Sequence, residues 1–150
     1  MKIFKYTFIL SAVFFLLALG TLVQADSHTK TSIEYADHIV YFNAFPTDSL
    51  PAQMTKQYGL KRSKNYAMIN VSVMEKGAGI PTGVKSTVTG NLKNLMGQTR
   101  AIEFREIKEG KAIYYIAQIG VQSKEIVNFN IDIKPDGGSE KYEIKFSKKF

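Results

Sequence analysis

The sequence predicts an all-β protein: an immunoglobulin-like sandwich of two antiparallel sheets, with about seven strands and one short helix between the first two strands. Two observations lead to this prediction. Apolar and polar residues alternate along several segments, as they do in a strand with one face in the core and the other in water. Clusters of Gly, Pro, Asn and Asp separate these segments. A small β-barrel is the alternative, because its strands would alternate in the same way.

The first two strands are expected at residues 39–45 and 66–74. The segment between them lacks the β pattern. Asp48 is suited to cap a helix, Pro51 to stand in its first turn and Gly59 to follow its last turn. We therefore expect a short helix in this connection.

Five more strands are expected in the second half of the chain, at residues 84–92, 99–107, 112–119, 127–134 and 142–146. Glu109-Gly110 is a hairpin signal between two of them. Residues 127–134 alternate most regularly, with apolar side chains at every second position from Val127 to Ile133. Such alternation predicts antiparallel strands that show one face to water.

The first 25 residues have the three parts of a secretory signal peptide. Lys2 and Lys5 make a basic start, and an uncharged, largely apolar run follows. Val23-Gln24-Ala25 is suited to cleavage after Ala25. The alternative is an uncleaved inner-membrane anchor, because a membrane span needs ~20 apolar residues. We expect a signal peptide at 1–25, a flexible leader at 26–32 and one β-sandwich domain at 33–150.

The composition narrows the class of protein further. Removal of 25 residues from 150 leaves 125, enough for one domain. The net charge of +7 falls to +5, because the signal contains two lysines and no acidic residue. The chain has no cysteine, which excludes a lipid-anchored lipoprotein, disulfides and thiolate metal sites. After cleavage we expect no stable membrane anchor.

Catalytic and metal-binding patterns are weak in this sequence. The two histidines are His28 and His38, too few for a zinc site that needs three or four converging ligands. No serine lies in a Gly-x-Ser-x-Gly turn. Glu106 is the one candidate acid, because it falls on the face of Ile102 and Phe104 unless a bulge turns it outward. We expect no cofactor and no metal.

A basic segment follows the predicted helix and supplies the candidate ligand-binding residues: Tyr58, Lys61, Arg62, Lys64 and Asn65. Three cations within four residues could hold a phosphate, a carboxylate or an acidic sugar. The alternative is a solvated loop without a ligand. We expect no nucleic-acid partner, because the chain has no recognised nucleic-acid-binding module and no basic helix.

The segment from Tyr58 to Val73 resembles the family called "domain of unknown function 4426". Residues 95–107 and 109–115 carry the same resemblance, and together these segments indicate a match over roughly residues 33–147. The resemblance implies a small secreted β-sandwich protein of Gram-negative bacteria, located in the periplasm. It implies no activity, because none is assigned to the family.

The leading functional hypothesis is a non-catalytic periplasmic binding or accessory protein, which recognises an anionic ligand of the cell envelope or a protein partner. One alternative is an enzyme that acts on an envelope polymer, with Glu106 as the acid and the basic segment holding substrate. Another is a structural component recruited by strand addition. The lysines of the final strand argue against this last alternative, because lysines at a sheet edge usually block pairing.

Overall fold

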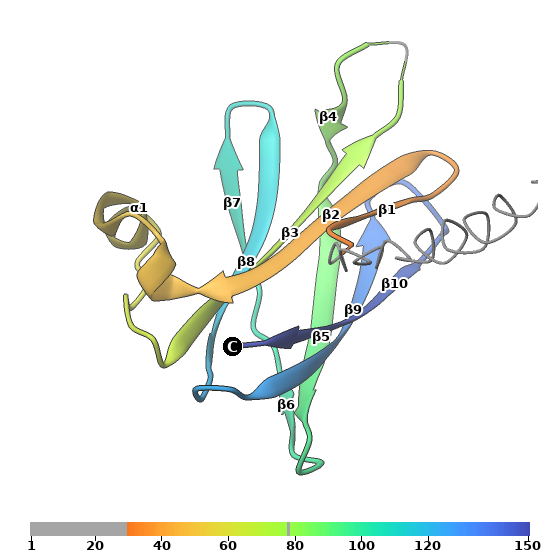
Figure 1. Ribbon diagram of the computed structural model, residues 1–150. Helices are drawn as coiled ribbons and strands as arrows, with labels where there is room; N and C mark the ends of the chain where they lie inside the picture. The colour runs from red at the N-terminus through yellow and green to blue at the C-terminus, as the bar shows by residue number, and fades with distance from the viewer. Residues whose placement is uncertain (1–29, 78) are drawn as a thin grey trace, which may run out of the picture.

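The computed structural model describes residues 30–77 and 79–150, which form two antiparallel sheets packed face to face (Figure 1). The predicted all-β sandwich is confirmed. The barrel alternative is wrong, because the two sheets remain separate and do not close. The predicted signal peptide and the first part of the leader lie outside the described residues.

The larger sheet has six strands in the order β1-β2-β3-β8-β7, with β4 paired to β3 at its margin. These strands are β1 (Ser32–Glu34), β2 (His38–Pro46), β3 (Tyr66–Glu75), β4 (Thr82–Gly83), β7 (Arg105–Glu109) and β8 (Ala112–Gly120). The smaller sheet has four strands in the order β10-β9-β5-β6. They are β5 (Ser86–Asn94), β6 (Thr99–Ala101), β9 (Ile126–Pro135) and β10 (Tyr142–Lys149).

The part of the chain that the structure describes has ten strands where about seven were expected. The predicted strand at 99–107 is two strands in different sheets, β6 and β7, joined by the irregular residues 102–104. At this crossing Ile102 is buried and its N–H donates to the carbonyl of Gly90 at 2.9 Å. The short strands β1 and β4 are the other two strands that the sequence pattern did not predict.

The core lies between the inner faces of the sheets and follows the predicted alternation. In β9, Val127, Phe129, Ile131 and Ile133 are each at most 2% exposed. They pack against residues of β2, β3 and β8 in one continuous apolar cluster. Burial of a large aliphatic side chain contributes about 1.5 to 3 kcal/mol, so this cluster supplies the main force holding the sheets together.

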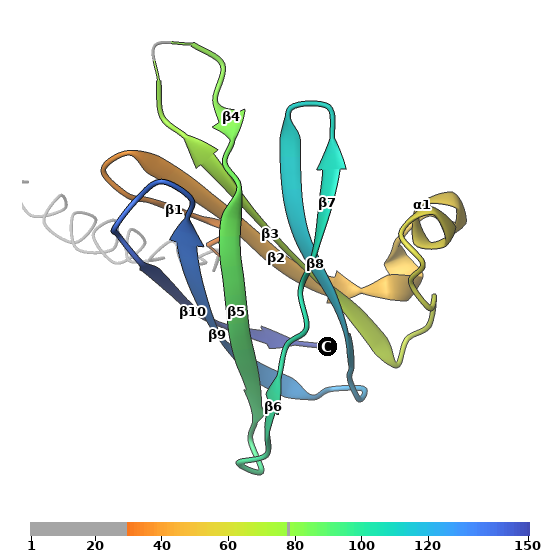
Figure 2. The ribbon, with the colours of Figure 1, turned by 180° about the vertical axis from the view of Figure 1, so that it is seen from behind.

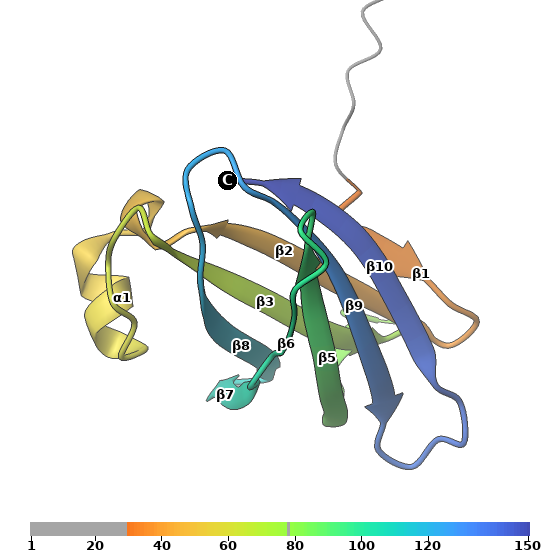
Figure 3. The same cartoon turned by 90° about the horizontal axis from the view of Figure 1, so that it is seen from below.

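The predicted short helix between the first two long strands is confirmed. A 3₁₀ turn (Thr47–Ser49) precedes α1 (Ala52–Gln57), and Asp48 lies in that turn and does not cap α1. The segment packs on the outer face of the larger sheet through a second apolar cluster that includes Leu50 and Met68. Viewed from below, α1 lies at the side of the molecule away from β10 (Figure 3). Within the described part of the chain, no helix has the length and apolar character needed to cross a membrane.

Candidate functional site

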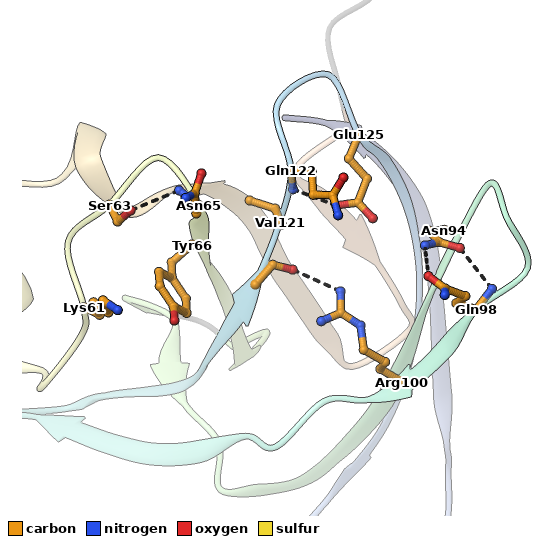
Figure 4. Close-up of a pocket in the computed structure, with 11 residues that line it drawn as sticks. Lys61, Ser63, Asn65, Tyr66, Asn94, Gln98, Arg100, Val121, Gln122 and Glu125 are labelled. Carbon is orange, nitrogen blue, oxygen red and sulfur yellow. Dashed lines mark hydrogen bonds between the residues drawn. The ribbon is translucent and has the colours of Figure 1, made fainter.

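A cleft of about 530 Å³ opens where three connecting segments meet: the loop after α1, the turn between β5 and β6, and the loop between β8 and β9 (Figure 4). We call it the polar cleft. Its lining residues are Lys61, Ser63, Asn65, Tyr66, Asn94, Gln98, Arg100, Gly120, Val121, Gln122 and Glu125. Nine of these eleven residues have polar or charged side chains, so the cleft is suited to a hydrated, polar ligand.

The loop after α1 is held in place by the protein's own polar groups. The hydroxyl of Thr47 is fully buried and accepts a hydrogen bond from the N–H of Ser63 at 3.0 Å. The side-chain amide of Gln118 bonds both backbone groups of Lys61, the carbonyl at 2.8 Å and the N–H at 3.2 Å. Val121 donates its N–H to the carbonyl of Asn65 at 2.9 Å. The loop is therefore a fixed wall of the cleft.

Two cations line the polar cleft from opposite sides. The ammonium of Lys61 lies 5.0 Å from the ring centroid of Tyr66, which is within range of a cation–π interaction. Arg100 extends from β6 and donates from Nη2 to the carbonyl of Gly120 at 3.0 Å. A guanidinium has five N–H donors, so this single bond orients Arg100 and leaves donors available.

Side-chain amides and one carboxylate complete the lining. Nδ2 of Asn94 donates to Oε1 of Gln98 at 2.7 Å. Glu125 accepts a hydrogen bond from the N–H of Gln122 at 2.8 Å through Oε2, which fixes the direction of its carboxylate. The cleft thus has two cations against one carboxylate and several amide donors, and the positive charge favours an anionic group near Lys61 and Arg100.

The structure divides the five candidate ligand-binding residues among different roles. Lys61 and Asn65 line the polar cleft. Arg62 donates from Nε to the carbonyl of Leu50 at 3.0 Å and from Nη2 to the carbonyl of Asp48 at 2.7 Å, so it braces the loop from outside the cleft. Lys64 is exposed and outside the cleft lining.

Tyr58, the fifth candidate, faces a different cavity. It lines a groove of about 340 Å³ between α1 and the outer face of the larger sheet, together with apolar residues such as Met68 and Ile116. Its hydroxyl donates to Oε1 of Glu109 at 2.6 Å, and this hydrogen bond raises the pKa of Tyr58 to about 12. The basic segment and Tyr58 therefore do not form one site.

Glu106, the candidate acid, lies outside both of these cavities. It is paired with Tyr115 across β7 and β8, and its carboxylate accepts a hydrogen bond from the Tyr115 hydroxyl at 3.2 Å. Lys108 lies 3.3 Å from the other carboxylate oxygen. The outward-turning bulge is not seen: Ile107 packs in the outer apolar cluster, so Glu106 points to the opposite, inner face, at the margin of the sheet.

Sequence reasoning missed the part of the polar cleft that comes from distant segments: Asn94, Gln98, Arg100, Gln122 and Glu125. Each lies near a strand end or in a turn, where polar residues are common for structural reasons. No local spacing connects them with the segment at 61–65. The fold brings them together because β5–β6 and β8–β9 place their connections at the same end of the two sheets as that loop.

The chain as a whole matches a recognised protein family. The family model for the domain of unknown function DUF4426 matches residues 32–150, and the chain belongs to this family. A crystal structure of a DUF4426 family protein from Pseudomonas aeruginosa PAO1 is 33% identical in sequence, with a TM-score of 0.67. The match covers 79% of this chain and 92% of that one.

More distant structures share the fold alone. FetP from uropathogenic Escherichia coli strain F11 is 11% identical with a TM-score of 0.59, and covers 81% of this chain and 93% of its own. A copper-bound variant of FetP is 11% identical with a TM-score of 0.57, and covers 81% and 95%. No curated protein matches this chain.

Proposed function

We propose that this protein is exported to the periplasm and binds an anionic ligand of the cell envelope in the polar cleft, without catalysing a reaction on it. The observation that carries this proposal is the placement of Lys61 and Arg100 in one cleft with amide side chains between and around them. Export is supported by the basic, apolar and small-residue pattern of residues 1–25.

The chemistry of the cleft favours binding of a ligand with a carboxylate or phosphate on a polar frame. Lys61 supplies a point charge and Arg100 supplies a planar donor fork, and together they suit such an anion. The amides of Asn65, Gln98 and Gln122 can donate to or accept from hydroxyl groups nearby. The same combination is suited to an acidic sugar.

The distant neighbours suggest a compartment but no ligand. FetP was produced in the periplasm of Escherichia coli, which is in keeping with the export proposed here. We do not extend the copper of the FetP variant to this chain. In residues 30–77 and 79–150, no three His, Asp or Glu side chains are grouped to hold a metal ion. His38 hydrogen-bonds through Nδ1 to the Tyr142 hydroxyl at 2.8 Å.

Binding can be tested with the protein recovered from the periplasm of cells that express the full chain. Its intact mass reports whether the mature chain begins at Asp26. Calorimetry with carboxylate- and phosphate-bearing sugars then measures affinity, with the neutral sugars as a reference. We expect the double variant Lys61→Gln/Arg100→Gln to bind the anionic sugar at least roughly tenfold more weakly, since each lost charged hydrogen bond is worth ~1.5–3 kcal/mol.

The matched control is Lys64→Gln/Lys111→Gln, which removes the same charge from positions outside the cleft lining. It should keep the affinity within about twofold, because surface charges at a distance are largely screened by salt. If both double variants lost affinity equally, the loss would come from the lower net charge of the protein. That result would contradict a specific binding site at Lys61 and Arg100. Binding of neutral and anionic sugars with the same affinity would contradict the role of the cations.

A further inference from the structure

The turn between β5 and β6 presents two large apolar side chains to water. Leu95 is 72% exposed and Met96 is 75% exposed. The hairpin projects at the end of the molecule opposite the β3–β4 and β7–β8 connections (Figures 1 and 2). We call residues 94–98 the apolar tip.

The apolar tip is held in one conformation by a dense set of hydrogen bonds. The side chain of Asn94 is buried, and its Oδ1 accepts from the N–H of Met96 at 3.1 Å and of Gln98 at 3.0 Å. Backbone bonds between Asn94 and Gln98 and from Gly97 to Asn94 close the turn. Gly97 has a φ of +82°, a conformation that a side chain would strain. The structure of the turn therefore keeps Leu95 and Met96 exposed, although exposure of apolar surface to water is unfavourable in free energy.

Two lysines, Lys93 and Lys124, lie beside the apolar tip. Lys93 precedes it and is exposed, and Lys124 lines a shallow depression together with Leu95 and Met96. None of the ion pairs within residues 30–77 and 79–150 involves either lysine. Glu125 is the carboxylate beside this surface, and it is engaged by the N–H of Gln122. The tip thus combines two exposed apolar side chains with a positive rim formed by Lys93 and Lys124.

We infer that the apolar tip docks on the surface of an anionic lipid bilayer. Leu95 and Met96 would enter the boundary between headgroups and acyl chains, and Lys93 and Lys124 would contact lipid phosphates. Burial of apolar area combined with attraction to anionic lipids is the physical basis of peripheral membrane binding. A projecting tip with a positive rim is complementary in shape and charge to such a deformable, negatively charged surface.

This inference is independent of the ligand proposed for the polar cleft. Because Asn94, Gln122 and Glu125 line both the cleft and the depression beside the tip, docking would hold the cleft close to the membrane surface. The variants that test the tip leave Lys61 and Arg100 in place. Failure of membrane docking and failure of sugar binding are therefore separate results.

The chain has no tryptophan, which allows a local fluorescence test. In the full chain, Met96→Trp places the single tryptophan at the tip, and Ile80→Trp places it on a 93% exposed apolar position in the β3–β4 connection. We expect vesicles of phosphatidylcholine with phosphatidylglycerol to shift the emission of Met96→Trp to shorter wavelength and to leave Ile80→Trp unchanged. The two variants share the same N-terminal segment. Membrane attachment by that segment alone would therefore not shift the tryptophan emission of Met96→Trp and leave that of Ile80→Trp unchanged.

Vesicle sedimentation tests the apolar and charged parts separately. We expect Leu95→Ser/Met96→Ser to lower the partition coefficient about tenfold or more, whereas Ile80→Ser leaves it unchanged. Lys93→Gln/Lys124→Gln should weaken binding only when phosphatidylglycerol is present, and Lys108→Gln/Lys111→Gln at the opposite hairpin should not. No emission shift for Met96→Trp, or equal shifts for both tryptophan variants, would overturn the inference. A tip that binds a protein partner instead would give that negative result.

Discussion

Lys61 and Arg62 are adjacent cations with different roles. The backbone of Lys61 is fixed by Gln118, which leaves its ammonium beside Tyr66 at the edge of the polar cleft. The guanidinium of Arg62 is turned the other way and bonds the carbonyls of Asp48 and Leu50. Arginine suits this bracing role because its planar fork can donate to two acceptors at once. The sequence pattern could not separate the two residues, because it records charge and not direction.

Arg62→Ala should therefore lower the stability of the protein rather than remove a ligand contact. It breaks two hydrogen bonds that tie the loop after α1 to the segment before α1, and we expect the free energy of unfolding to fall by about 1 to 2 kcal/mol. Urea denaturation followed by circular dichroism measures this change. Lys64→Ala, an exposed cation two residues away, should change it by less than about 0.5 kcal/mol. Equal stabilities for the two variants would contradict the bracing role.

At the scale of elements, the alternating pattern predicted strands well and the path between sheets poorly. β9 follows its predicted range closely, because every inward side chain meets the core. The segment predicted as one strand at 99–107 instead crosses between the sheets at Ile102. Both arrangements bury an apolar residue there, so a local pattern cannot distinguish them. The polar cleft escaped prediction for the related reason that its three segments meet only after the strands have paired.

Close contact between β5 and β9 gives a prediction for Gly90. A Cβ atom at this position would lie 2.8 Å from the carbonyl oxygen of Asn130 and 3.3 Å from Cα of Ile131. The obstacle is backbone in a paired strand, which cannot move aside without breaking the ladder. We expect Gly90→Ala to lower the free energy of unfolding by about 1 to 3 kcal/mol, as overpacking usually does.

The matched control for Gly90 is Gly79→Ala, where a Cβ would meet no atom within 4 Å. Thermal or urea unfolding of the two variants compares a crowded with an open glycine. Gly79→Ala should stay within about 0.5 kcal/mol of the unchanged protein, because loop positions without such contacts tolerate substitution. If Gly90→Ala were as stable as Gly79→Ala, β5 and β9 could move apart without a loss in the free energy of unfolding, which would contradict this prediction.

At the scale of the whole molecule, the two sheets are joined by a polar bridge as well as by the apolar core. The hydroxyl of Tyr115 in β8 accepts a hydrogen bond from the N–H of Ser86 in β5 at 2.6 Å and donates to Glu106 in β7 at 3.2 Å. The hydrogen bond from Tyr115 makes Glu106 part of the bridge between the sheets. The carboxylate that looked like a candidate acid in the sequence is in contact with a buried phenol and with Lys108.

Burial of Tyr115 makes the stability of the protein depend on alkaline pH. Burial, together with the negative charge of Glu106 and its hydrogen bond, raises the pKa of Tyr115 to about 12 from the ordinary value of 10.0. The folded state thus holds this proton more tightly than the unfolded state. The resulting stabilisation is complete below pH 10.0 and is lost as the pH rises toward about 12. A shift of two pKa units corresponds to about 2.7 kcal/mol, and solvent screening lowers this value, so we expect a loss of the order of 1 to 2 kcal/mol from this group.

Urea unfolding of the unchanged protein and of Tyr115→Phe, across pH values from about 9 to about 12, isolates this contribution. Tyr115→Phe should be less stable at the lower end, because the N–H of Ser86 loses its acceptor. Its stability should then fall less steeply with pH, so that the two curves converge. If the curve of Tyr115→Phe instead ran parallel to that of the unchanged protein, the phenol of Tyr115 would titrate alike in the folded and unfolded chains, which contradicts the prediction.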